Sequence, residues 1–202
     1  MSGQPEAGKP VRSAAGRLDR DRCLLLVIDI QARLAPHVQG HEAVIGRTEA
    51  LLAAARQFRI PCLATEHCAA QIGPMIPRLR ERCEDGEIFG KTRFGAADHP
   101  DFESLLRAHG RPQVVVAGME AHVCVLQTVL GLAARKYQVF VVGDAVGSRG
   151  VRAADRQFAL DRMRAAGCTV AGAETVLFEW TRAGDDAAFR DVLALVKGLP
   201  PP

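Results

Sequence analysis

The sequence predicts a single α/β domain with a three-layer, Rossmann-like fold, in which helices flank both faces of a mostly parallel sheet. Apolar strand-like runs alternate with helical segments along the chain, which is typical of parallel sheets joined by right-handed crossovers. The runs Cys23–Ile28 and Val114–Ala117 contain no polar side chain, which indicates strands buried on both faces. A length of 202 residues, without an internal repeat or linker, fits one domain.

Six short runs are expected to form the strands. The first and fourth are the apolar runs, and the others are short segments between helical stretches. In chain order they lie near Cys23–Ile30, Cys62–Thr65, Glu87–Phe89, Gln113–Ala117, Gln138–Val142 and Thr169–Ala171.

Five longer segments between and after these runs are expected to be helical. Their apolar residues recur at helical rather than strand spacing. They lie near Glu42–Phe58, Asp101–His109, Val123–Ala134, Val151–Ala166 and Asp186–Val196.

Composition narrows the class of protein. The net charge of +3, the scattered arginines and an aromatic content of 5% argue against a nucleic-acid partner. No run is long and apolar enough to span a membrane. The six cysteines form no C-x-x-C pair, so we expect reduced thiols and a cytoplasmic location.

Residues 1–20 are predicted to form a disordered or loosely docked tail, and residues 21–202 the domain. The tail is rich in Gly, Pro, Ser and Arg and has no apolar segment typical of a secretory signal. An arginine-containing organellar presequence is the alternative, and Glu6 and Asp19 argue against it.

Cys124 is the first candidate for chemistry, because it follows the fourth apolar run where a buried strand turns into a helix. Unpaired N–H groups and the helix dipole at a helix start favour a thiolate and can stabilise an oxyanion. A buried cysteine is also a common core residue. Taken alone, Cys124 fits that structural role better.

Two further residues change this weighting. Asp29 directly follows the first apolar run, where a carboxylate needs a partner. Lys91 follows Gly90 and is flanked in the sequence by Phe89 and Phe94. All three residues fall near the carboxyl ends of different expected strands, which is the edge where open parallel sheets bind ligands.

Four segments together resemble the isochorismatase-like cysteine hydrolase superfamily. They are Leu26–Gln31, Phe89–Phe94, Gly118–Val125 and Val142–Ala145. Within a resemblance that covers about residues 22–197, the phrases around Cys124 and after Asp144 are similar to the isochorismatase domain-containing proteins.

The resemblance implies an isochorismatase-like hydrolase fold with an Asp-Lys-Cys triad made of Asp29, Lys91 and Cys124. It also implies that the Met119–Glu120 peptide is cis and that the backbone N–H groups of Glu120 and Cys124 form an oxyanion hole. The side chain of Glu120 departs from the smaller residues of many relatives, and could enter the pocket or cap the helix. Further pocket residues are expected to be Gln31, Glu66 and Phe94.

No metal or other cofactor is expected. Metal-dependent nicotinamidases of this superfamily carry an Asp-x-His pair after an early strand, and the corresponding segment here is Thr65-Glu66-His67-Cys68. Adjacent residues of an extended chain point to opposite faces and rarely converge on one ion. The chain also lacks the phosphate-binding G-x-x-x-x-G-K-[ST] and the dinucleotide-binding G-x-G-x-x-G patterns at the required positions.

We therefore predict a metal-independent cysteine hydrolase that acts on a small amide, imide or related acyl compound through a thioester. The alternatives are a catalytically silent member that binds a metabolite or protein, an isochorismatase-type vinyl-ether hydrolase, and a thiol redox sensor. A homo-oligomer is expected from the resemblance, with the alanine-rich segment Leu51–Ala55 as one possible packing face.

Overall fold

The computed structural model describes residues 16–201, which contain one six-stranded parallel sheet with the order β3-β2-β1-β4-β5-β6. This agrees with the predicted α/β class. The strands are β1 (Cys23–Ile28), β2 (Cys62–His67), β3 (Ile88–Lys91), β4 (Gln113–Met119), β5 (Gln138–Gly147) and β6 (Thr169–Ala171).

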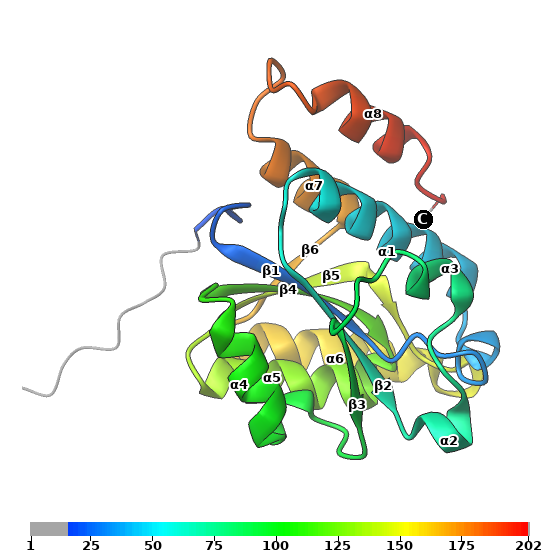
Figure 1. Cartoon of the computed structure of the whole chain (residues 1–202). Coiled ribbons are helices and arrows are strands. Elements are labelled where there is room, and N and C mark those ends of the chain that lie inside the picture. The colour runs from blue at the N-terminus through cyan, green and yellow to red at the C-terminus, as the bar shows by residue number, and fades with distance from the viewer. Residues whose placement is uncertain (1–15, 202) are drawn as a thin grey trace, which may run out of the picture.

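Helices cover both faces of the sheet (Figure 1). One layer holds α1 (His41–Gln57), α3 (Pro77–Arg80), α7 (Ala173–Thr181) and α8 (Phe189–Lys197). The other holds α4 (Pro100–Ala108), α5 (Leu126–Ala134) and α6 (Ala153–Ala165). A short helix, α2 (Ala69–Ile72), follows β2.

Strand β1 contributes to both cores because side chains alternate across a strand. Leu24, Leu26 and Ile28 pack with the α4–α6 layer, whereas Cys23, Leu25 and Val27 pack with the α1 layer. All six are fully buried. A strand without polar residues is therefore what this central position requires.

The sequence analysis did not predict helix α7, although its apolar residues have helical spacing. Ala173, Val176, Leu177 and Trp180 occupy positions i, i+3, i+4 and i+7, and all four are buried. The segment has only nine residues and no strong capping side chain, so the local signal was weak.

Several strand ends differ from the prediction at the functional edge, including β3, which continues to Lys91, and β4, which continues to Met119. Strand β1 ends at Ile28, because Asp29 has a φ of 51° and leaves the extended conformation. Strand β5 continues to Gly147, which pairs with Met119 after a register irregularity between Val116 and Gly118.

Part of the segment assigned to the tail packs against the domain. Leu18 is 1% exposed and its N–H donates to Glu179, while Arg20 donates to Trp180 and Asp186. The prediction for residues 1–15 lies outside the described residues. Within residues 16–201, no helix is both long and apolar enough to cross a membrane.

Candidate active site

The strand order places a crevice at the carboxyl ends of β1 and β4. The connection after β1 leads to α1 on one face, and the connection after β4 leads to α5 on the other. Such a switch point is where open α/β sheets bind ligands. Asp29 follows β1, Cys124 follows β4, and Lys91 is the last residue of β3.

Gly118 allows β1 and β4 to approach closely at this edge. Its φ is +136°, and a Cβ there would lie 2.1 Å from the carbonyl oxygen of Ile28. Only glycine adopts this conformation readily. The position of Asp29, one residue after Ile28, therefore depends on the missing side chain at Gly118.

Asp29 and Lys91 form a fully buried ion pair. The Nζ of Lys91 donates to Oδ2 of Asp29 at 2.7 Å, and to the carbonyl oxygens of Arg93 and Phe94 at 3.2 Å each. The other carboxylate oxygen accepts from the Thr65 hydroxyl at 2.7 Å. Buried charges persist only with such partners, so both side chains are held in one orientation.

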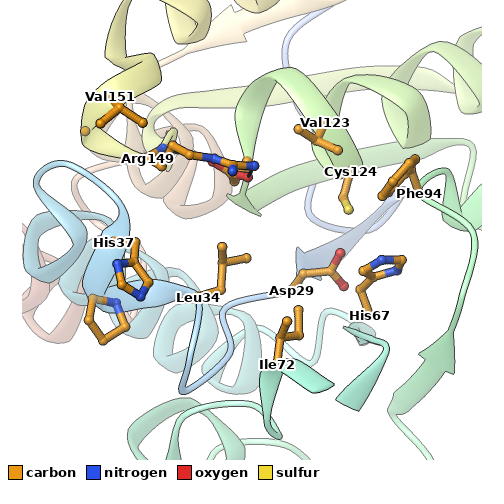
Figure 2. Close-up of a pocket in the computed structure, with 13 residues that line it drawn as sticks. Asp29, Leu34, His37, His67, Ile72, Phe94, Val123, Cys124, Arg149 and Val151 are labelled. Atoms are coloured by element: carbon orange, nitrogen blue, oxygen red, sulfur yellow. Dashed lines mark hydrogen bonds and ion pairs between the residues drawn. The ribbon is translucent and has the colours of Figure 1, made fainter. Parts of the chain in front are cut away.

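Cys124 lies in one turn of π-helix, Ala121–Val125, which precedes α5. The predicted helix start is therefore a wider turn than the first turn of an α-helix, of a kind often found at functional sites. The Thr128 hydroxyl donates to the Cys124 carbonyl at 2.7 Å. In Figure 2 the sulfur of Cys124 points toward the carboxylate of Asp29.

Burial and, after it, the nearby Asp29 charge raise the pKa of the Cys124 thiol to about 12, and Lys91 opposes both effects. The resting thiol is thus protonated at neutral pH, in contrast to the thiolate expected from the helix start. Burial also raises the pKa of Cys23 and Cys62 to about 12. Cys124 differs from these two because it borders an open cavity next to a carboxylate.

Glu120 directs its side chain to Arg149 rather than to a helix cap. Arg149 donates to the Glu120 carboxylate from Nε at 2.8 Å, from Nη2 at 2.6 Å and from its backbone N–H at 3.0 Å. Burial opposes ionisation of Glu120, but these hydrogen bonds outweigh it and lower the pKa of the carboxyl. The Met119–Glu120 peptide bond is cis.

His122 forms a second contact between the turn that contains Cys124 and the segment that follows β5. Its Nδ1 lies 2.9 Å from the Ser148 hydroxyl, and its Nε2 lies 4.0 Å from Asp155. Ser148 is 2% exposed. The imidazole therefore links the Cys124 turn to the end of β5, which is a structural role.

A cavity of about 770 Å³ opens at this edge, a volume suited to a small molecule. Asp29, Cys124 and Phe94 lie toward one end, with His67 beside them, and Arg149 and Val151 lie toward the other (Figure 2). The lining residues are Asp29, Leu34, Pro36, His37, His67, Ile72, Phe94, Glu120, Val123, Cys124, Arg149, Gly150 and Val151.

Of the three further pocket residues expected, Phe94 borders the cavity, whereas Gln31 and Glu66 are engaged elsewhere. The fully buried Gln31 amide exchanges hydrogen bonds with the His67 backbone and donates to the Gly73 carbonyl. Glu66 accepts from the Met75 N–H and from Arg80. Both side chains hold the loop after β2, which their sequence position alone did not indicate.

The segment Glu66-His67-Cys68 does not converge on one point. Glu66 and Cys68 border a separate, smaller cleft, while His67 lines the main cavity. Across residues 16–201, no group of three or more His, Cys, Asp or Glu side chains is arranged to hold a metal ion.

Arg149 is a cavity residue that the sequence analysis missed. Its guanidinium lies near the site because β5 extends to Gly147 and pairs there with Met119. The sequence signal was the phrase Asp144–Arg149, which supported only the family resemblance.

Comparison with known proteins decides the family. The model of the isochorismatase domain matches residues 23–175, more than half of the chain. The chain belongs to the isochorismatase family. Isochorismatase domain-containing protein 2 of Danio rerio is 32% identical over 182 residues, which cover 90% of each chain.

Two solved structures of the family share this fold over nearly their whole length. MAR1 ribonuclease from Caenorhabditis elegans is 33% identical, with a TM-score of 0.85 over 92% of this chain and 95% of that chain. The YcaC gene product of Escherichia coli, described as an octameric hydrolase of unknown specificity, is 28% identical, with a TM-score of 0.84 over 91% and 90%.

Proposed function

We propose that this isochorismatase-family protein is a cysteine hydrolase that cleaves the C–N bond of a small amide or imide. The observation that carries the proposal is that the Cys124 thiol lies beside the buried Asp29–Lys91 pair at one end of the cavity. A nucleophile beside an oriented base is the arrangement that covalent hydrolysis requires.

In the proposed first step, the Cys124 sulfur attacks the carbonyl carbon and its proton passes to Asp29. Because burial holds the thiol in the protonated form, this transfer must accompany the attack. The C–N bond then breaks, Asp29 returns the proton to the leaving nitrogen, and a thioester remains. Water attacks the thioester and gives its proton to Asp29; the C–S bond then breaks, Asp29 passes that proton to the Cys124 sulfur, and the acid is released.

Lys91 acts on both partners of this transfer. It holds the Asp29 carboxylate through one hydrogen bond and lowers the pKa of the Cys124 thiol. The backbone N–H groups of Glu120 and Cys124 are assigned to the oxyanion. One donor of this kind contributes roughly 3 kcal/mol to transition-state stabilisation.

Ammonia release from a panel of primary amides tests the proposal, with Cys124→Ala as the inactive control. We expect turnover in the wild type alone, and unchanged turnover after exhaustive chelation. An RNA oligonucleotide belongs in the panel because the nematode relative is named a ribonuclease. Ammonia release that persists in Cys124→Ala, or RNA cleavage without any amide turnover, would refute the proposed chemistry.

We also propose that the protein forms a homo-oligomer and works in the cytoplasm. The octameric YcaC structure supports the first point. The apolar side chain of Phe158, which lies outside the cavity and is 70% exposed, also supports it.

A further inference from the structure

The charged groups at the cavity form two ion pairs. Asp29 is paired with Lys91, and Glu120 is paired with Arg149. The three N–H donors of the Lys91 ammonium meet three acceptors, namely the Asp29 carboxylate and two backbone carbonyls. Lys91 therefore has no donor left for a negatively charged ligand.

Arg149 is paired along one edge of its guanidinium, and its side chain is 48% exposed. Its Nε, Nη2 and backbone N–H all donate to the Glu120 carboxylate, which is 5% exposed. Such a bidentate pair fixes the guanidinium plane and balances its charge. The two pairs together contribute no net charge to the cavity.

The rest of the wall is largely uncharged. Burial and the neighbouring Lys91 lower the pKa of His67, which favours its neutral form. His37 and Gly150 also line the cavity, and apolar side chains supply most of the remaining surface: Leu34, Pro36, Ile72, Phe94, Val123 and Val151.

We infer that the substrate is a small uncharged amide with an apolar acyl group, and that the Glu120–Arg149 pair selects against charged substrates. The inference rests on the proposed hydrolysis at Cys124 and specifies its substrate class. A carboxylate or an ammonium group entering this cavity would lose hydration beside carboxylate, ammonium and guanidinium groups whose charges already balance one another in pairs. An apolar acyl group gains from leaving water.

Glu120 is the specificity-determining side chain in this account. Replacing it with glutamine retains its shape and removes its charge, so Arg149 becomes an unbalanced cation at the cavity wall. A substrate carboxylate could then pair with the guanidinium. The preference should shift toward carboxylates without any change in the apolar wall.

Binding to full-length Cys124→Ser protein separates this inference from catalysis, because the amides are not consumed. The probes are benzamide, 4-carbamoylbenzoate and 4-(aminomethyl)benzamide, which share one ring and amide and differ in charge. We expect calorimetry to give benzamide a dissociation constant at least about tenfold lower than either charged probe. Glu120→Gln in the same background should bring 4-carbamoylbenzoate to parity with benzamide or below it.

Arg78→Gln is the matched control, because this arginine pairs with glutamates on the surface away from the cavity. It should leave the ranking unchanged. Equal or tighter binding of a charged probe by the Cys124→Ser protein, or no detectable preference for benzamide, would overturn the inference. If benzamide is preferred yet the wild type releases no ammonia from any amide, the proposed hydrolysis fails and the charge selectivity stands.

Discussion

At the scale of single residues, the central feature is a protonated thiol beside an ion pair. The three side chains come from different strand ends, and each has its own local reason to be there. Asp29 adopts a left-handed φ of 51°, which aspartate and asparagine tolerate better than most residues. Asp29→Asn is therefore a substitution that removes the base while respecting the backbone.

Asp29→Asn should separate thiol acidity from catalysis. After burial, the Asp29 charge is the largest influence that raises the pKa of Cys124 to about 12, and Lys91 lowers it. Without the carboxylate, more thiolate exists at any pH below 12, so iodoacetamide should label Cys124 faster between pH 7 and 9. Ammonia release should be lost. Peptide mapping measures the labelling, and slower labelling than in the wild type would contradict this electrostatic assignment.

Lys91→Ala should have the opposite effect on the thiol and a larger effect on stability. Removing the cation raises the thiol pKa and slows labelling of Cys124 at neutral pH. It also leaves Asp29 buried without its partner, which typically destabilises a fold by about 3–5 kcal/mol. Urea denaturation measures this loss, with Lys197→Ala on an exposed helix end as the control.

A Lys91→Ala protein as stable as the wild type would show that Lys91 and Asp29 do not form an ion pair in solution. Labelling of Cys124 at the wild-type rate would show that Lys91 does not act on the thiol.

At the scale of elements, the sequence predicted a strand well wherever a run was entirely apolar. The apolar runs of β1 and β4 predicted both strands and the sheet edge at which Asp29 and Cys124 lie. It predicted strand ends less well where the end is determined by pairing with a neighbouring strand. The extension of β5 to Gly147, and with it the approach of Arg149 to Glu120, results from pairing with Met119.

The positions of Gln31 and Glu66 illustrate the same limit. Both polar side chains lie near a predicted strand end. The local pattern could not show whether they line the pocket or hydrogen-bond to the backbone of the loop. Their partners, the backbone groups of His67 and Gly73 and of Met75, come together only in the folded loop. Phe94 differs because its side chain is apolar and forms no hydrogen bond. It is 54% exposed and lines the cavity.

Gly118→Ala tests the contact between β1 and β4. The added methyl group would strain the positive φ and collide with the Ile28 backbone, so we expect a loss of roughly 2–5 kcal/mol together with reduced turnover. Gly90→Ala in β3 is the control, because a Cβ there meets no atom within 4 Å. Thermal melts give the comparison, and equal melting temperatures for both variants would contradict the role of Gly118.

At the scale of the whole molecule, one fold brings the carboxyl ends of β1, β3 and β4 to a single cavity. The exposed Phe158 lies outside this cavity on α6, and apolar surface of this kind is commonly covered in assemblies. Light scattering should therefore report a mass that is a multiple of 21.7 kDa. Phe158→Ser should lower it, and a monomer mass for the wild type at micromolar concentration would contradict the proposed oligomer.

The most direct test of the central claim is to trap the acyl group on Cys124. Wild-type protein is incubated with benzamide, quenched in acid, and analysed by intact mass spectrometry and peptide mapping. We predict a mass increase equal to a benzoyl group, located on the peptide that contains Cys124, sensitive to hydroxylamine and absent in Cys124→Ala. An acyl group found on another residue, or turnover of benzamide with no adduct at Cys124 under any quench time, would contradict the account.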